Sequence, residues 1–299
     1  MLTVKVFQDR FYDLLDCSQN MTCLGDFEGF TEGFSWSETE QEMTFSALTC
    51  QKTWRWSERE GVQLLRINTN IGNGMCYDGQ GRLIVCEQIG YRVARASRDM
   101  KDYQVIASEY NGKPFNSPND VVVHSSGMIY FTDPHFGRRP TKHGRFGSQP
   151  QSCNGVYRID PNSLDVTLAA DQLDAPNGLC FSPDESKMYF TEGPTKRLTV
   201  MDILPDGMLT NPRLFAHTAQ CGVGAADGIK SDEFGNIWAT AEGGIQVFAP
   251  DGTILGVILL PESSGNLAFG GKHLDVLFMG SGSKVFTVKT KVRGIKLRW

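Results

Sequence analysis

Short hydrophobic runs alternate with polar turns along most of the chain. Polar turns at 78–82, 125–127, 182–187 and 232–236 each lead into an apolar run, as in Leu83–Cys86. Two weaker copies, at 37–42 and 270–275, keep the same order of turn and strand. Six copies spaced by about 40 to 60 residues are typical of radial β-architectures built from small four-stranded sheets. The pattern predicts an all-β fold, a six-bladed β-propeller of four-stranded antiparallel blades.

The composition agrees with many short strands joined by tight turns. The 299 residues are 40% hydrophobic and include 32 glycines, while sustained helical periodicity is scarce. A closed ring of six blades would use the whole chain, so we expect one domain over residues 1–299. The stretch Val4–Leu15 is the one place where the apolar spacing also fits a short helix.

Charge and hydropathy narrow the range of partners. The net charge is -5, and the basic residues are dispersed except for a patch at Arg138, Arg139, Lys142 and Arg145. This pattern does not predict a continuous basic surface that could bind a phosphate backbone, so we expect no nucleic-acid partner. No apolar run is long enough to cross a bilayer, and charged residues from Lys5 onward interrupt any leader-like core. We therefore expect a soluble cytoplasmic protein with no membrane partner; the oligomeric state stays open.

The eight cysteines do not form a paired zinc-ligand spacing, and most lie in apolar strand-like contexts. We expect reduced core thiols. Cys17 and Cys23, in a looser polar segment, are the one pair to test for a disulfide bridge.

Four oxygen-bearing side chains stand at turns beside predicted strands, at the same phase of the repeat: Glu32, Asn119, Asn177 and Asp227. Each one alone has an ordinary structural explanation, because Asn and Asp are common turn residues. In a propeller, however, the innermost strands point a common end into the central channel. Convergence there would join two carboxylates and two amide oxygens, a donor set that suits a hard divalent cation.

An ordered set of short motifs resembles the family of gluconolactonase, regucalcin (senescence marker protein) and luciferin-regenerating enzyme. The motifs are Asn73-Gly74-Met75, Asn116-Ser117-Pro118-Asn119-Asp120, Tyr130-Phe131-Thr132-Asp133-Pro134, Pro176-Asn177-Gly178-Leu179 and Asn266-Leu267-Ala268-Phe269-Gly270. Any one of them is a common turn motif, whereas the ordered set is specific and spans nearly the whole chain. The resemblance implies a six-bladed propeller that hydrolyses lactones with a bound divalent cation.

The resemblance also implies roles for individual residues. Glu32, Asn177 and Asp227 match the metal ligands, and Asn119 matches a position that completes the metal shell or hydrogen-bonds the substrate. Phe34 and Gln88 depart from the commoner family pattern and affect the substrate assignment rather than the metal site. Oxygen donors favour Ca²⁺, with Zn²⁺, Mn²⁺ and Mg²⁺ as alternatives.

The expected chemistry is hydrolysis of a small-molecule lactone. A cation polarises the carbonyl, and Asp227 takes the proton of the attacking water; attack by Asp227 itself is the open alternative. The chain has no Gly-x-Ser-x-Gly elbow. Two other functions stay open: organophosphate hydrolysis at the same site, and calcium binding without catalysis.

The remaining candidates are less constrained by the sequence. Glu87 and His135 are possible substrate contacts, with a surface charge and a solvated turn as their alternatives. Asp120 and Asp133 are expected to brace neighbouring turns by accepting backbone hydrogen bonds. The polar stretch 137–152 is either a lid over the channel mouth or a surface excursion.

Overall fold

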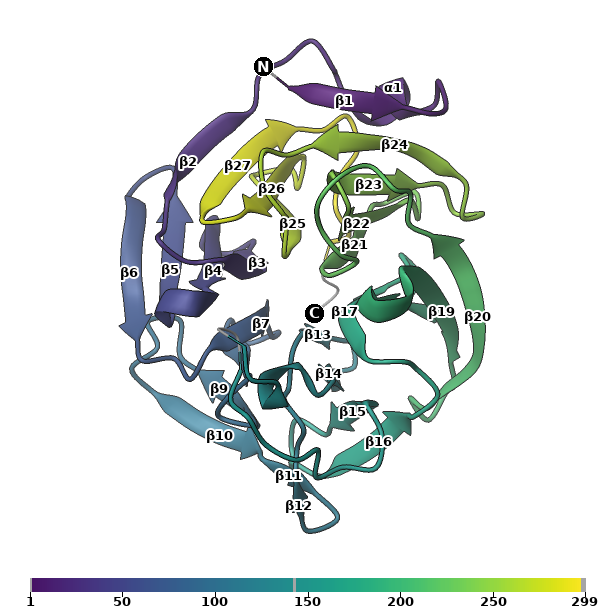
Figure 1. The fold of residues 1–299 in the computed structure, drawn as a ribbon. Coiled ribbons are helices and arrows are strands. Elements are labelled where there is room, and N and C mark those ends of the chain that lie inside the picture. The colour runs from purple at the N-terminus through teal and green to yellow at the C-terminus, as the bar shows by residue number, and fades with distance from the viewer. Residues whose placement is uncertain (1, 142–143, 297–299) are drawn as a thin grey trace.

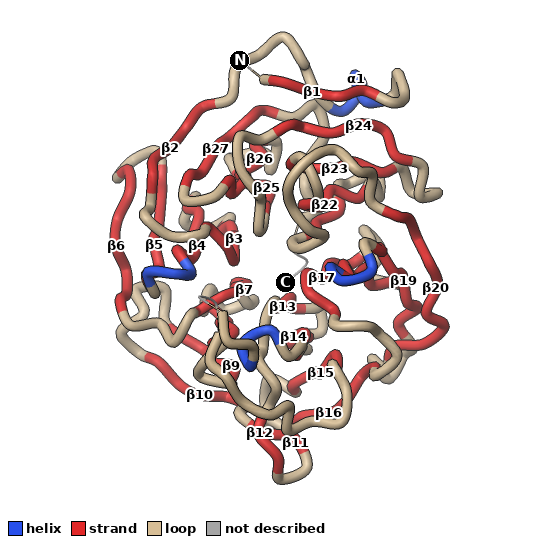
Figure 2. Tube along the Cα trace, in the orientation of Figure 1, coloured by secondary structure: helices blue, strands red, loops and turns tan. Residues whose placement is uncertain are grey.

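The computed structural model describes residues 2–141 and 144–296 and confirms the predicted propeller. Six antiparallel sheets of at least four strands are arranged around an axis, with β3, β7, β13, β17, β21 and β25 innermost (Figure 1). Almost all of the described chain outside these strands consists of turns and loops (Figure 2). Blade 1 contains β3 (Thr31–Ser37), β4 (Glu42–Ala47), β5 (Lys52–Ser57) and β6 (Gly61–Ile67). Blade 2 contains β7 (Gly72–Tyr77), β8 (Leu83–Glu87), β9 (Arg92–Ala96) and β10 (Tyr103–Ala107).

Blades 3 and 4 follow in chain order after a small hairpin. The hairpin consists of β11 (Glu109–Tyr110) and β12 (Lys113–Pro114). Blade 3 contains β13 (Val121–Val123), β14 (Ile129–Asp133), β15 (Gly155–Ile159) and β16 (Val166–Ala170). Blade 4 contains β17 (Pro176–Phe181), β18 (Lys187–Glu192), β19 (Arg197–Ile203) and β20 (Leu209–His217). Single-turn 3-10 helices are η1 (Leu48–Cys50), η2 (Phe136–Arg138) and η3 (Gly193–Thr195).

The N-terminal segment closes the ring. Blade 5 contains β21 (Ile229–Ser231), β22 (Ile237–Ala241), β23 (Gly244–Phe248) and β24 (Ile254–Leu259), and β1 (Thr3–Val6) pairs with β24. Blade 6 contains β25 (Leu267–Gly270), β26 (Val276–Ser281) and β27 (Lys284–Lys289), and β2 (Thr22–Asp26) is its outermost strand. Pairing the first and last parts of the chain in one sheet removes an open edge from the ring. The ambiguous stretch Val4–Leu15 holds both the end of β1 and a short helix, α1 (Phe11–Leu14).

The repeated polar turns connect the first and second strands of each blade. In the turn before β8, Asp78 Oδ1 accepts hydrogen bonds from the backbone amides of Gln80 (3.0 Å) and Arg82 (2.9 Å). Asp232 does the same in the turn before β22, for Phe234 (3.0 Å) and Asn236 (2.9 Å). In these two copies of the repeat, an aspartate closes the hairpin turn from within.

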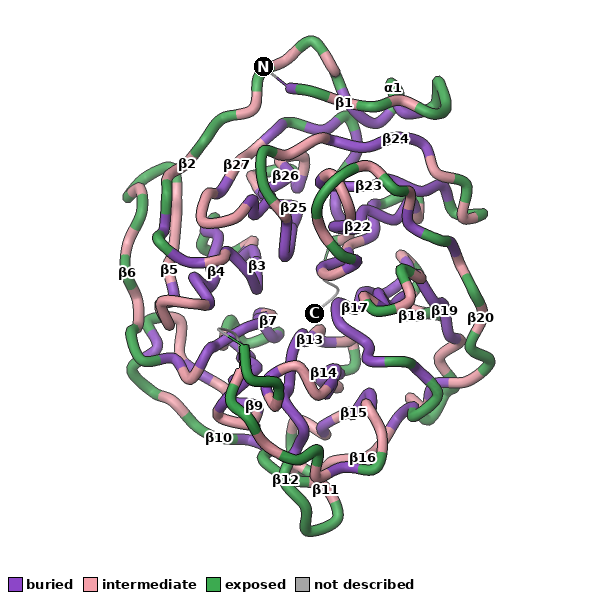
Figure 3. The backbone as a smooth tube through the Cα atoms, viewed as in Figure 1, coloured by how far each residue is buried: buried purple, intermediate pink, exposed green. Residues whose placement is uncertain are grey.

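Hydrophobic clusters between adjacent blades form the core, and the inner strands are more buried than the outer ones (Figure 3). All eight cysteines are free thiols, so Cys17 and Cys23 are not bridged. None of the helices in the described parts of the chain has the length and apolar character needed to cross a bilayer.

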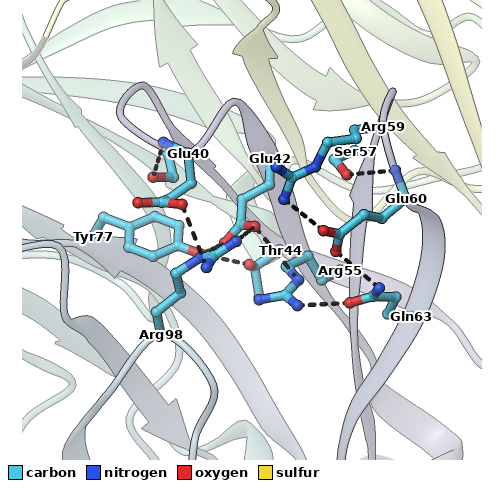
Figure 4. Close-up of polar contacts among 11 residues, drawn as sticks. Glu40, Glu42, Thr44, Arg55, Ser57, Arg59, Glu60, Gln63, Tyr77 and Arg98 are labelled. Atoms are coloured by element: carbon cyan, nitrogen blue, oxygen red, sulfur yellow. Dashed lines mark hydrogen bonds and ion pairs between the residues drawn. The ribbon is translucent and has the colours of Figure 1, made fainter.

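A buried ion cluster joins blades 1 and 2 (Figure 4). Glu42, at the start of β4, is 1% exposed and accepts hydrogen bonds from Nε (2.9 Å) and Nη2 (2.6 Å) of Arg98. Arg55 lies 3.4 Å from the same carboxylate, and the Tyr77 hydroxyl donates to it at 3.3 Å. Two cations and a hydroxyl thus compensate this carboxylate within the protein.

Candidate functional site

The four predicted oxygen donors lie at one end of the inner strands. Glu32 is in β3 and Asn177 is in β17, while Asn119 and Asp227 each lie two residues before an inner strand. The carboxyls of Glu32 and Asp227 lie close enough to act on each other's pKa, and the Asn177 side chain lies close enough to Asp227 to lower its pKa. The carbonyl of Thr132 accepts the backbone amide of Asn119 (2.8 Å), and its hydroxyl donates to the Asn177 carbonyl (2.7 Å). Three predicted ligands are therefore grouped together, and Asn119 is held beside them.

Irregular pairing at this end of the inner strands turns these side chains toward the axis. The register shifts between Glu32 and Ser35 in β3, and between Pro176 and Leu179 in β17. Such bulges re-aim side chains and are common beside active sites. Gly33, at a φ of 61°, has no room for a side chain, because a Cβ would lie 2.0 Å from the Asn73 carbonyl oxygen. The bulge and the glycine together let adjacent blades approach closely at the site.

Hydroxyl groups on the second strands fix the backbone of the site residues. Thr132, Thr191 and Thr240 donate to the carbonyls of Asn177, Asp227 and Gly265, and Ser46 donates to that of Asn73. Each bond runs from the second strand of one blade to the inner strand of the next blade or to the residues just before it. Sequence reasoning missed these residues, although a signal was present: an apolar residue precedes the hydroxyl near the end of each second strand, as in Tyr130-Phe131-Thr132 and Tyr189-Phe190-Thr191.

Burial and mutual repulsion raise the pKa values of the carboxyls at the site, so protons and a cation would compete for them. Glu32 is 3% exposed, and burial, reinforced by the charge of Asp120, raises its pKa to about 7. Burial, then the charges of Glu32 and Asp120, raise the pKa of Asp227 well above its usual value. Asp227 keeps part of its surface exposed, but its carboxyl is enclosed by the ring. Because a nearby cation stabilises the ionised forms, these carboxyls would release protons when a metal binds.

Asp120 is closer to the site than the sequence indicated. Its Oδ1 accepts the Val121 amide at 2.9 Å, whereas its buried Oδ2 has no hydrogen bond of good geometry. Burial raises its pKa, and the charge of Lys230 works in the opposite direction. The Asn266 side chain opposes the rise in the pKa values of both Asp120 and Glu32 and was missed as a site residue. A buried acceptor without a donor adds to the excess of negative oxygens at this position.

The donor set fits a hard divalent cation through amide as well as carboxylate oxygens. Within residues 2–141 and 144–296, no group of three or more His, Cys, Asp or Glu side chains is arranged to hold a metal ion. Ligation therefore needs Asn177 and Asn119 beside Glu32 and Asp227. A mixed set of carboxylate and carbonyl oxygens is the chemistry that Ca²⁺ prefers, and it is poor for thiophilic metals.

Asp133 has the bracing role that was predicted for it. This fully buried carboxylate accepts the backbone amides of Asn116 (2.8 Å) and Ser117 (2.7 Å), and burial raises its pKa to about 7. The bonds fix the turn that leads into Asn119. Asp133 thus acts on the site through the backbone.

Glu87 and His135 are not in contact with the axial residues. Glu87 is fully buried and accepts hydrogen bonds from Arg92 (2.5 Å), Tyr103 (2.6 Å) and Asn70 (3.0 Å). The imidazole Nδ1 of His135 lies 2.9 Å from Asn154 Oδ1. Their predicted contacts with substrate stay predictions, and the bonds of Glu87 give it a structural role.

The described part of the polar stretch 137–152 is tied to the segment that precedes Asn119. The Arg138 guanidinium donates to the carbonyls of Asn116 (2.7 Å) and Phe115 (2.7 Å) and lies 3.4 Å from the centre of the Tyr91 ring. Lys142, a member of the predicted basic patch, lies outside the described residues. A function of this stretch as a lid stays a prediction.

A six-bladed propeller with an oxygen-lined axial site defines a recognisable class of protein, and comparison with known proteins gives the family. The chain belongs to the SMP-30/gluconolactonase/LRE-like family, whose model matches residues 30–283. This result confirms the resemblance inferred from the motifs.

Relatives of similar length carry lactonase names. The chain is 29% identical to the gluconolactonase of Zymomonas mobilis, over 96% of this chain and 86% of the relative. It is 26% identical to the pentonolactonase XacC of Haloferax volcanii, over 83% and 80% of the two chains. Among solved structures, a gluconolactonase from Xanthomonas campestris has 31% identity and a TM-score of 0.88, over 96% and 94% of the two chains. These relatives are lactone-hydrolysing enzymes.

Proposed function

We propose that this protein is a divalent-cation-dependent lactonase that hydrolyses a sugar lactone. The observation that carries the proposal is the grouping of Glu32, Asn177 and Asp227, which come from three different blades and lie at the same end of the inner strands. The lactonase names of the relatives support the same reaction class. A carboxylic ester hydrolase of this kind needs a polarised carbonyl, an activated water and a group that accepts its proton.

Glu32, Asn177 and Asp227 would hold the cation, with Asn119 as a further ligand or as a contact for the substrate. We expect Ca²⁺ because all the proposed donors are oxygens. When bound, the cation would supply Lewis-acid polarisation of the lactone carbonyl and stabilisation of negative charge on its oxygen.

The chain itself supplies the base and its orientation. As water attacks the carbonyl carbon, Asp227 takes a proton from that water at a carboxylate oxygen. The ring C–O bond then breaks, the proton passes to the departing alkoxide, and the product is a hydroxy acid. The Asn177 amide and the hydroxyl of Thr191, which bind the side chain and the carbonyl of Asp227, hold this base in place.

The test is hydrolysis of a panel of aldonolactones and aliphatic lactones by the protein loaded with Ca²⁺, Mn²⁺ or Zn²⁺. Acid release should exceed the enzyme-free rate, be lost after chelation and return when the cation is restored. Asn177→Ala should lower kcat/KM, while Asn162→Ala, at an exposed turn, should not. Absence of acid release with every cation and lactone would overturn the proposal.

A further inference from the structure

A cavity lies toward the end of the inner strands that is farther from the axial carboxyls. Its apolar wall comes from inner strands of four blades, at Phe34, Trp36, Val121, Val123, Phe181 and Phe269. Its volume is about 140 Å³. Trp36 lies four residues beyond Glu32 on β3, which corresponds to about 13 Å along a strand. None of the four predicted oxygen donors lines this cavity.

The wall is formed in advance of any ligand. Phe34, Val121 and Val123 are each 2% exposed, so packing fixes their positions. The segment Gly294–Lys296 completes the lining. Gly294 donates its amide to the Leu274 carbonyl at 2.8 Å, and a Cβ at this glycine would lie 2.3 Å from Phe269 Cβ. The C-terminal segment is therefore seated closely against blade 6.

Most polar groups in the lining already have partners. The Ser35 hydroxyl oxygen accepts the Tyr77 amide at 3.1 Å, and the Ser231 hydroxyl donates to the Phe181 carbonyl at 2.5 Å. Lys230 donates to the Ile229 carbonyl at 3.0 Å, and its charge acts on Asp120. Three further charged side chains of the lining also have partners: Glu185 accepts the Ser125 amide at 3.0 Å, and Lys296 lies 4.0 Å from the Glu38 carboxylate. The apolar wall itself offers water few of the two to four polar contacts that hold it in a cavity.

We propose that this cavity binds a small uncharged apolar molecule of about the size of benzene. Apolar cavities of about 150 Å³ in protein interiors stay dry and take up benzene or xenon. Filling the space restores dispersion contacts that the wall residues otherwise lack. The proposal is independent of lactone hydrolysis, because it concerns the other end of the inner strands and different side chains.

The first experiment uses the unmodified full chain. Crystals pressurised with xenon should show one strong xenon peak between Phe34, Val123 and Phe181. Benzene should bind saturably in an NMR titration, with shifts of the methyl signals of Val121, Val123 and Ala268. Absence of the xenon peak together with absence of saturable benzene binding would overturn the proposal without any variant.

Two cavity-filling variants on different strands then locate the site. Ala268→Leu and Val123→Phe should each weaken benzene binding at least tenfold, whereas Val62→Phe, on an exposed part of β6, should leave it unchanged. Benzoate should bind at least tenfold more weakly than benzene. Wild-type affinity in both folded filling variants, or equal affinity for benzoate and benzene, would contradict an uncharged ligand in this cavity.

Discussion

Buried carboxylates lie at both ends of the hairpin formed by β3 and β4, and they are neutralised in different ways. At the end of β3 nearest Glu42, the protein supplies Arg55, Arg98 and the Tyr77 hydroxyl. At the other end, Glu32 meets Asp227 and lies near Asp120, so its neighbours add negative charge. An ion pair made within the chain is a structural element. A cluster that lacks such a partner must take up protons or a cation from solution, which is why we propose the axial group as the functional one.

The largest effect in this comparison is expected from Asp227→Asn. Loss of a ligand and of the proposed base should lower kcat/KM for the preferred lactone by about 10³-fold or more. The neutral amide also removes repulsion from Glu32, so the cation-free variant should be at least as stable as the wild type at pH 8. Steady-state kinetics and thermal unfolding measure the two effects.

Asp9→Asn, at an exposed position, is the control and should change neither quantity. Retention of activity within tenfold in Asp227→Asn would remove Asp227 from the catalytic role. A clearly less stable cation-free variant would show that the axial carboxylates do not repel one another.

The next effect concerns pH and the cation-free protein. The pKa of Glu32 is raised from 4.5 to about 7, so the folded state binds more protons than the unfolded state in this range. The stabilisation is complete below about pH 4.5 and is lost as the pH rises through about 7. One pKa unit corresponds to about 1.4 kcal/mol, so the loss from this group is roughly 3.5 kcal/mol. Denaturant unfolding after chelation, at several pH values, checks the sign.

Saturating Ca²⁺ should oppose this loss, because the cation replaces the protons. Glu32→Gln, which cannot ionise, should flatten the pH dependence without cation. The raised pKa of Asp133 acts in the same sense as that of Glu32. If the stability of the chelated wild type instead increases from pH 4.5 to pH 7, the result contradicts a raised pKa for these carboxyls.

Glu42→Gln should have the opposite sign from Asp227→Asn. Removal of the charge leaves Arg55 and Arg98 without their carboxylate, and breaking a buried pair is destabilising. Because the Arg98 side chain is 37% exposed, we expect a loss of about 2 kcal/mol rather than the larger values seen for fully buried pairs. The free energy of unfolding measures it, and kcat/KM per folded molecule should stay the same. A neutral or stabilising effect of Glu42→Gln would contradict the difference between Glu42, which the protein neutralises with two arginines, and the axial carboxyls, which repel one another.

A smaller effect is expected at the hydroxyls that fix the site. Thr191→Val keeps the shape but removes the bond to the Asp227 carbonyl, at a cost of about 1 kcal/mol in stability. A positioning role predicts a decrease in kcat of several-fold with little change in KM. Thr167→Val, at a partly buried position of the outer strand β16, is the control. Equal effects of both variants on kcat would leave Thr191 with a merely structural role.

The fold and the four axial oxygen donors could be predicted from the sequence, whereas much of the rest of the site could not. The repeated turns at Asp78 and Asp232 are local, so their pattern is visible in the chain and predicts the blade order. Glu32, Asn177 and Asp227 were found because they share a phase of that repeat. Asp120 was predicted only to brace a turn, and Asn266 was assigned no role, because their effects on Glu32 cross between blades and depend on how the ring closes.

Glu87 is the opposite case, a residue for which the sequence suggested a contact with substrate and the structure shows structural bonds. Next to a turn in the sequence, it resembles a pocket acid, but its surroundings come from Arg92, Tyr103 and Asn70, which no single-residue pattern connects. Which groups surround a buried carboxylate is a property of the tertiary structure, so a local sequence pattern does not show whether the carboxylate is already neutralised within the protein.

The most direct test of the account is anomalous diffraction from crystals equilibrated with Mn²⁺ as a substitute for Ca²⁺. The account predicts one strong peak on the propeller axis, within about 2.0 to 2.6 Å of oxygens from Glu32, Asn177 and Asp227. No peak at these side chains under saturating Mn²⁺, or a peak bound by other residues instead, would contradict it.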